Sequence, residues 1–215
     1  MGVIAGANIN DNGLIFSLDA ANFRSYSGSG LTSFGLVGGI NATLVNGVGF
    51  TSTNGGSFFF DGTNDYIQMP LSISSGSSFS INLKFKLYTL LPDMRLVGAV
   101  SGNTDQFTVS VEAGVLRWWM SNSWRNTIFS PTIETLYDMF LTYDGTNLRL
   151  FINGNYITVD NGNAYFDNLG IANPFVLLYG SYLNGLIYGF QLYNRALTAK
   201  EIKQNYNATK KRYGL

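Results

Sequence analysis

The sequence contains no cysteine and no histidine. Without cysteine, the chain can form neither disulfides nor thiolate metal sites. Without histidine, it cannot build a Ser-His-Asp or Cys-His catalytic centre, and it lacks the usual nitrogen ligand of zinc. The commonest routes to catalysis are therefore closed, which favours a protein that works by binding.

Charge is also scarce, at 12% of residues, with 13 cationic side chains balanced by 13 acidic ones. Soluble domains typically have about 25% charged residues. Because nucleic-acid binding needs a basic face, we do not expect it here. No apolar run reaches the roughly 18 residues that span a bilayer, so no membrane insertion is expected. Residues 1–6 lack the basic start and apolar core of a signal peptide.

Alternation of apolar and polar residues is the dominant pattern, and it is clearest in residues 79–87. The apolar side chains there point to one side, and the polar ones point to the other: Ser80, Asn82, Lys84 and Lys86. A strand with one buried face produces this pattern, and a helix does not. Further strands are predicted at 14–18, 57–60, 66–69, 95–100, 107–111, 137–143, 148–152 and 175–179.

Asn-Gly and Asp-Gly pairs separate many of these segments, and they supply the positive φ angles that tight turns require. Residues 144–147 are predicted to join 137–143 to 148–152, and Asn153-Gly154 to reverse the chain again. Three adjacent antiparallel strands would follow. No linker or break in composition stands out, so we expect an N-terminal arm at 1–12 and a single domain at 13–215.

One segment has the pattern of a helix. Thr198 is a suitable N-cap, and Glu201 three residues later completes a capping box. The helix is predicted over about 199–207, with Ile202 and Tyr206 packed onto the sheets. The basic residues 210–212 are predicted to be a solvated helix end, where positive charge opposes the helix dipole.

Residues 14–22, 60–67, 143–145 with 150–154, and a closing stretch (189–198, 201–202 and 205–207) resemble the laminin-G-like, concanavalin A-like domains of phages that infect marine bacteria. The closing stretch, which begins Gly-Phe-Gln-Leu-Tyr-Asn-Arg-Ala-Leu-Thr, is the most specific match. The resemblance implies an all-β fold, a two-sheet antiparallel jelly-roll sandwich with one short C-terminal helix. It does not imply one function, because this fold hosts lectins, glycosidases and virion parts.

The function that the resemblance implies first is a non-enzymatic virion structural protein, either capsid decoration or a fibre or tail component. Its partners would be other virion proteins and host surface glycans, and it would be made in the host cytoplasm and located on the capsid surface or tail. A free carbohydrate-binding, lectin-like module is the alternative. Because 46% of the residues are hydrophobic and few are charged, we also expect a homo-oligomer. By analogy with the way virion appendages are commonly built, the oligomer would have three subunits.

The pattern of carboxylates argues against an enzyme. Retaining glycosidases of this superfamily carry a Glu-x-Asp-x-x-Glu cluster on one strand, which sets two carboxyl groups about 5 Å apart. This chain has only three glutamates, Glu112, Glu134 and Glu201, and they are far apart in sequence. We therefore predict no catalytic residues.

A calcium site is a candidate at residues 61–65. Some members of the resembled family hold calcium in loops, and Asp61, Asn64 and Asp65 offer the oxygen ligands that calcium needs. Calcium requires six or more such oxygens, however, and only three are apparent. The alternative is a turn in which the carboxylates bind nearby backbone amides. No other cofactor is expected.

All three tryptophans lie in one aromatic cluster, which is the main candidate for ligand binding: Arg117, Trp118, Trp119, Asn122, Trp124 and Arg125. In a strand, Trp118 and Trp119 face opposite sides, so one should fill the core and the other should lie outside. An exposed tryptophan beside arginine and asparagine suits sugar stacking and hydrogen bonding. The competing interpretation, which the sequence favours, is core packing or a subunit interface.

Overall fold

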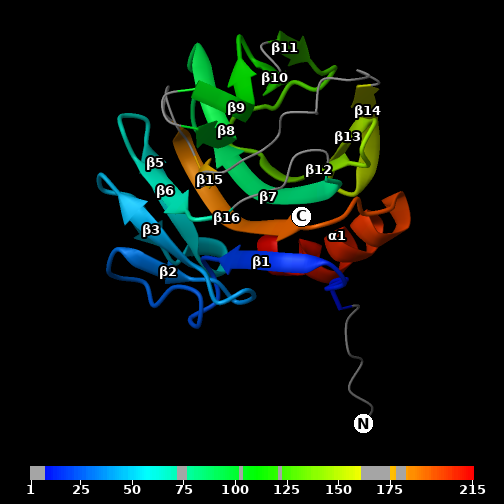
Figure 1. Cartoon of the computed structure of the whole chain (residues 1–215). Helices are drawn as coiled ribbons and strands as arrows, with labels where there is room; N and C mark the ends of the chain where they lie inside the picture. Colours follow the sequence, from blue (N-terminus) through cyan, green and yellow to red (C-terminus); the bar gives the residue numbers. More distant parts are fainter. Residues whose placement is uncertain (1–7, 72–76, 102–103, 121–122, 161–174, 178–182) are drawn as a thin grey trace.

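The chain forms a sandwich of two antiparallel sheets, as the sequence predicts (Figure 1). The computed structural model describes residues 8–71, 77–101, 104–120, 123–160, 175–177 and 183–215. From edge to edge, the first sheet contains β14 (Asn155–Asp160), β13 (Leu148–Ile152), β12 (Leu136–Tyr143), β7 (Phe79–Leu87), β16 (Asn184–Tyr193), β5 (Ser57–Asp61) and β4 (Gly49–Thr51), and β1 (Leu14–Asp19) also pairs with β16.

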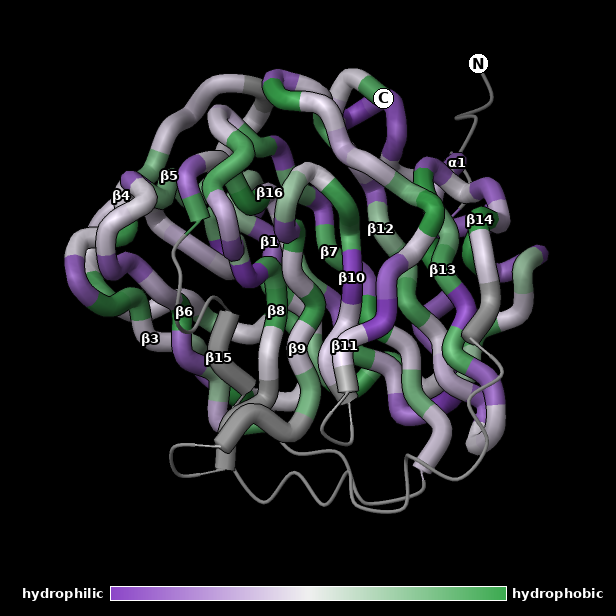
Figure 2. Tube along the Cα trace, turned by 90° about the horizontal axis from the view of Figure 1, so that it is seen from above, coloured by the Kyte–Doolittle hydropathy of each residue, from purple (hydrophilic) through white to green (hydrophobic). Residues whose placement is uncertain are grey.

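The second sheet packs against the inner face of the first. In order, it contains β11 (Ser123–Asn126), β10 (Val115–Met120), β9 (Thr104–Glu112), β8 (Asp93–Ser101), β15 (Phe175–Leu177), β6 (Tyr66–Met69), β3 (Asn41–Val45) and β2 (Thr32–Phe34). Figure 2 looks onto this sheet and shows β8, β9 and β10 side by side. A short 3-10 helix, η1 (Thr53–Gly55), precedes β5.

The apolar row of β7 lies between the two sheets, as the alternation predicts. Its members are buried together with apolar side chains of the facing sheet, such as Val109, Val111 and Trp118. Each alternate residue of a strand points to the same side, so one row of β7 enters the common core. The fold class predicted from the sequence is thus confirmed.

The polar row of β7 is also buried, and here the prediction of a single buried face is wrong. Ser80, Asn82 and Lys84 are almost inaccessible, because the C-terminal segment covers the outward face of the first sheet. Ser80 Oγ donates to the Arg195 carbonyl and accepts the Leu197 amide, both at 2.9 Å. The polar alternation therefore serves a second packing layer, not solvent.

A buried ion pair lies within this layer. Lys84 Nζ is 3.4 Å from Asp138 Oδ2 on β12 and donates to Asn82 Oδ1 at 2.7 Å. Asn82 in turn donates to the Asp138 carboxylate. The Tyr213 ring, from the end of the helix, lies 5.5 Å from the ammonium. Both charges are thus desolvated between the sheet and the C-terminal segment.

The predicted hairpins are confirmed. Tyr143 pairs with Leu148 across the turn, and the Asp144 amide donates to the Asn147 carbonyl. Asn153 and Gly154 both adopt positive φ, at 52° and 71°, and lead into β14. The three strands β12, β13 and β14 therefore follow one another at the edge of the first sheet.

The helix α1 (Ala199–Tyr213) starts where the capping box predicts but extends six residues beyond the predicted end at 207. Thr198 Oγ1 accepts the Glu201 amide, and Glu201 Oε2 accepts the Thr198 amide. The extension has a tertiary cause, because Tyr213 is buried against Tyr188 on the sheet. No helix in the described part of the chain has the length and apolar character needed to cross a membrane.

The first described residues lie beside the helix α1 (Figure 1). The Asn10 amide donates to Asn205 Oδ1 at 2.6 Å, and Asn10 Nδ2 donates to Glu201 Oε1 at 2.8 Å. Gln204 donates to the Asn8 carbonyl at 2.9 Å. Residues 8–10 of the predicted arm therefore bind the helix directly. Of the basic residues at the helix end, Arg212 pairs with Asp19 at 2.7 Å.

Replacing Lys84 by methionine should destabilise the fold strongly, because it leaves the buried Asp138 carboxylate without its cation. Loss of one partner of a buried pair typically costs about 3–5 kcal/mol. Urea unfolding of Lys84→Met measures this loss. Glu134→Gln is the matched control, since it breaks the Lys86–Glu134 pair, in which the glutamate is 62% exposed, and should cost less than about 1 kcal/mol. Equal losses in the two variants would contradict the account.

Glu201 should make stability depend on pH in the acid range. Hydrogen bonds from Arg195, and then those from Thr198, lower the pKa of Glu201 from the ordinary value of 4.5 to about 2. Because the folded pKa lies below the unfolded one, the stabilisation is complete above the unfolded pKa and is lost as pH falls through the folded pKa. In thermal melts, the melting temperature of Glu201→Gln should lie below that of the native chain at pH 5, and this difference should shrink as the pH falls to about 2. A difference in melting temperature that stays constant across this range would contradict the stabilising role of the ionised Glu201.

Candidate functional site

Three of the six candidate residues meet on the outer face of the second sheet. Trp118 is buried in the core, so its neighbours Arg117 and Trp119 point outward from β10. Trp119 pairs with Trp124 of β11 in register, which places both rings on the same face. We call the surface formed by Arg117, Trp119 and Trp124 the tryptophan face.

The side chains of the tryptophan face are stacked on one another. The Arg117 guanidinium carbon lies 3.7 Å from the centre of the Trp124 ring, and the Trp119 and Trp124 rings are 5.2 Å apart at 58°. Arg117 also pairs with Glu112 of β9. Burial lowers the pKa of Arg117 below its ordinary value, while Asp93 acts in the opposite direction. The guanidinium is thus held between a carboxylate and an aromatic ring.

Polar side chains of β9 lie beside the tryptophan face. Thr108 is in register with Trp119, and Ser110 is in register with Arg117. Both hydroxyls are buried, and neither finds a hydrogen-bond partner among the described residues. Buried hydroxyls of this kind are normally satisfied by protein or by bound water. The alternation at 107–111 predicts their common face, but the sequence does not show which residues of β10 they oppose.

A cavity of about 510 Å³ opens at the Glu112 end of the same strands. It is lined by Leu90, Leu91 and Pro92 on one side and by Glu112, Ala113 and Gly114 at the turn between β9 and β10. Because Glu112 binds Arg117, the cavity borders the tryptophan face. No sequence pattern indicates this cavity, since Leu90–Pro92 approaches the turn only in the folded chain.

Two of the other aromatic-cluster candidates, Trp118 and Arg125, do not join this face. Trp118 fills the core, which is one of the two positions predicted for adjacent tryptophans. Arg125 is in register with Trp118 and so lies on the opposite side of β11 from Trp124. Asn122 lies outside the described residues.

The loop at 61–65 uses its polar groups for its own turn. Asp61 Oδ1 accepts the Thr63 amide at 2.7 Å, and Asp65 Oδ2 accepts the Asp61 amide at 3.1 Å. The Asn64 carbonyl accepts a hydrogen bond from Asn46. Burial, together with the nearby Asp61 charge, raises the pKa of Asp65.

Asp65 Oδ1 is the one atom of this loop that fits a cation, since it is buried and has no partner among the described residues. No group of three or more acidic, histidine or cysteine side chains comes together in the described chain. Calcium needs six or more oxygen ligands, so the groups present here fall short of a calcium site.

Each of the three glutamates has a cationic partner. Glu112 pairs with Arg117, Glu134 with Lys86 and Glu201 with Arg195. Glycoside hydrolysis instead needs two carboxyl groups that face each other across the scissile bond. The described glutamates are arranged as structural ion pairs and not as such a couple.

Several solved structures have the same fold at low sequence identity. The sialidase of Trypanosoma rangeli matches with a TM-score of 0.74 and 15% identity over 99% of this chain, and the match spans 35% of the sialidase. The binding domain of botulinum neurotoxin serotype G matches with a TM-score of 0.70 and 17% identity, over 90% of this chain and 50% of that one.

A third match covers nearly the whole of a single domain taken from a larger enzyme. Domain 4 of AbnA, an extracellular arabinanase from Geobacillus stearothermophilus solved in complex with arabinotriose, has a TM-score of 0.69 and 16% identity. The match covers 90% of this chain and 98% of that domain. At these identities, the likenesses show the fold alone.

The sequence itself matches one protein family. No curated protein matches the sequence. A family model described as the Concanavalin A-like lectin/glucanases superfamily, of laminin G type, matches residues 61–203, about two thirds of the chain. This match confirms the laminin-G-like resemblance, and the phage source stays a prediction. The chain belongs to the concanavalin A-like lectin/glucanase superfamily.

Proposed function

We propose that the chain is a non-catalytic carbohydrate-binding domain whose ligand binds on the tryptophan face. The observation that carries this proposal is the stack of Arg117, Trp124 and Trp119 on the outward side of the second sheet. Aromatic rings offer a flat apolar surface to the C–H groups of a sugar, and side chains around them supply hydrogen bonds. Here the guanidinium of Arg117 and the carboxylate of Glu112 lie beside the rings.

Stacking also fixes the site before a ligand arrives. Trp124 is covered by Arg117 on one side and touched by Trp119 on another, and Arg117 is tied to Glu112. Fixed side chains lose little conformational freedom on binding, so more of the contact energy appears as affinity. The cavity between Leu90–Pro92 and the β9–β10 turn gives a longer glycan room to continue beyond the rings.

The comparisons support a binding role over a catalytic one. The structural neighbour from the arabinanase is a separate domain of its enzyme and holds arabinotriose, and the neurotoxin neighbour is a binding domain. The paired glutamates of this chain agree with a non-enzymatic role. Together these observations favour the lectin-like alternative over the virion role as the first hypothesis.

The virion role, with other virion proteins as partners and a homo-oligomeric state, stays a prediction that is compatible with glycan binding. Exposed apolar side chains such as Phe23, Leu31 and Phe34 could support contacts between subunits. Mass spectrometry of purified phage particles would test it directly. Finding the chain in particles together with glycan binding would indicate a receptor-binding virion protein.

Trp124→Ala should weaken glycan binding by about fivefold or more, because truncating an aromatic residue at the centre of a binding site typically costs more than about 1 kcal/mol. The measurement is a glycan array followed by calorimetric titration of the best neutral oligosaccharide. Phe23→Ala is the control, since Phe23 is an aromatic residue that is more exposed than Trp124 and lies outside the tryptophan face. If Trp124→Ala instead changes the sedimentation coefficient and leaves glycan affinity intact, the tryptophans form a subunit interface and the proposal fails.

Binding and stability should both be independent of calcium. Amides of the 61–65 loop bind one oxygen of Asp61 and one of Asp65, and the loop supplies too few oxygens for the ion. EDTA should therefore leave the melting temperature and the glycan affinity unchanged. A lowered melting temperature that added calcium restores, and that Asp65→Asn abolishes, would show that the loop holds a structural ion.

A further inference from the structure

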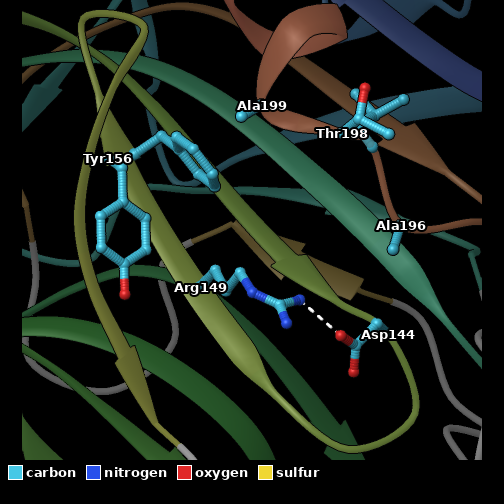
Figure 3. Close-up of a pocket in the computed structure, with 8 residues that line it drawn as sticks. Asp144, Arg149, Tyr156, Ala196, Thr198 and Ala199 are labelled. Atoms are coloured by element: carbon cyan, nitrogen blue, oxygen red, sulfur yellow. Dashed lines mark hydrogen bonds and ion pairs between the residues drawn. The ribbon is translucent and has the colours of Figure 1, made fainter.

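A second cavity, of about 570 Å³, opens on the outward side of the first sheet (Figure 3). One wall comes from the β12–β13 turn, β13 and β14, and the other from residues 196–199 ahead of and at the start of α1. The tryptophan face lies on the outward side of the opposite sheet, so the two places share no residue.

The aromatic part of this cavity has one buried and one accessible ring. Phe151 is buried with Leu197 beneath the helix, and Tyr156 packs edge-on against it, with ring centres 5.5 Å apart at 71°. Tyr156 remains 53% exposed. Phe151 therefore supports the Tyr156 ring from one side, while the rest of that ring is available to a ligand in the cavity.

A fixed ion pair completes the lining. Asp144 Oδ1 accepts the amides of Thr146 and Asn147, and Arg149 Nη1 donates to Asp144 Oδ2 at 2.5 Å. Burial alone would raise the pKa of Asp144, but these hydrogen bonds outweigh it and lower the pKa to about 2. About a third of each side chain is exposed, so both the carboxylate and the guanidinium can reach a ligand.

We propose that this cavity is a second binding site, for a neutral sugar residue. The two opposite charges cancel, so the site has no net attraction for an anion. A carboxylate next to a guanidinium offers an acceptor and several donors side by side, which matches two neighbouring hydroxyls of a sugar ring. Tyr156 and Leu197 would contact the apolar C–H side of the same ring.

A chain with ligand sites on the outward sides of opposite sheets is bivalent. One short glycan cannot reach both sites, so each site binds a different glycan or a distant part of a long one. The inference goes beyond the proposed function, because loss of either site would leave the other intact.

Amide-resolved NMR titration with maltose, cellobiose, lactose and arabinotriose tests the inference. At least one of these sugars should shift the amides of Asp144–Arg149, Tyr156 and Thr198–Ala199. Arg149→Met should weaken the affinity measured from these shifts by about tenfold or more, since a hydrogen bond to a charged group is worth roughly 1.5–3 kcal/mol. Tyr156→Ala should also weaken this affinity, because it removes the ring that contacts the sugar. Tyr156→Phe keeps the ring and should bind within about threefold of the native chain.

The outcomes separate the two sites. Shifts confined to the tryptophan face, or none at the cavity with any of the four sugars, would overturn this inference whatever happens to the proposed function. Shifts confined to the cavity would support it while contradicting the proposed function. If inorganic phosphate shifts the cavity amides and the sugars do not, the site binds anions and the inference fails. An unchanged amide spectrum of the Tyr156→Ala variant elsewhere controls for folding.

Discussion

The C-terminal segment is held against the first sheet by polar side chains that β7 and β12 present on their outward side. Ser80 binds the carbonyl of Arg195 and the amide of Leu197, just before the helix. Lys84, Asn82 and Asp138 bind one another beneath the end of the helix. Burying a polar group is costly unless it is paired, so this contact favours one position for the segment. The placement of α1, and of the N-terminal residues that bind it, depends on this layer.

The asymmetry of the sandwich follows from that constraint. The helix and the stretch ahead of it close much of the outward side of the first sheet, and they leave a cavity only where the sheet edge at β13 and β14 passes the start of the helix. The described part of the second sheet has no helix over it, and there Trp119 and Trp124 lie outside. One side of the sandwich is therefore used mainly for packing, and the other is available for binding.

Much of the fold could be predicted because its rules are local. The alternation in β7, the turn at 144–147 and the capping box at Thr198 each act over a few residues, and each is found in the structure. The end of α1 was predicted too early, because Tyr213 is held by Tyr188, which is distant in sequence. The burial of Lys84 was missed for the same reason, since nothing near β7 in the sequence indicates a covering layer.

In the candidate sites too, local features could be predicted and features that depend on distant contacts could not. The opposite directions of Trp118 and Trp119 follow from strand geometry alone, whereas the stacking of Arg117 on Trp124 depends on the β10–β11 register. The cavity between Arg149, Tyr156 and Leu197 joins residues about 50 positions apart and has no sequence pattern of its own. Register and tertiary contact therefore decide which of the polar and aromatic residues meet.

The central claim is that the outward tryptophans, and not the buried one, contact a glycan. The indole N–H resonances of the three tryptophans test it most directly in a titration with a glycan that binds the chain. The account predicts that the signals of Trp119 and Trp124 shift with the ligand while that of Trp118 stays in place. Saturable binding with all three indole signals unmoved would contradict it.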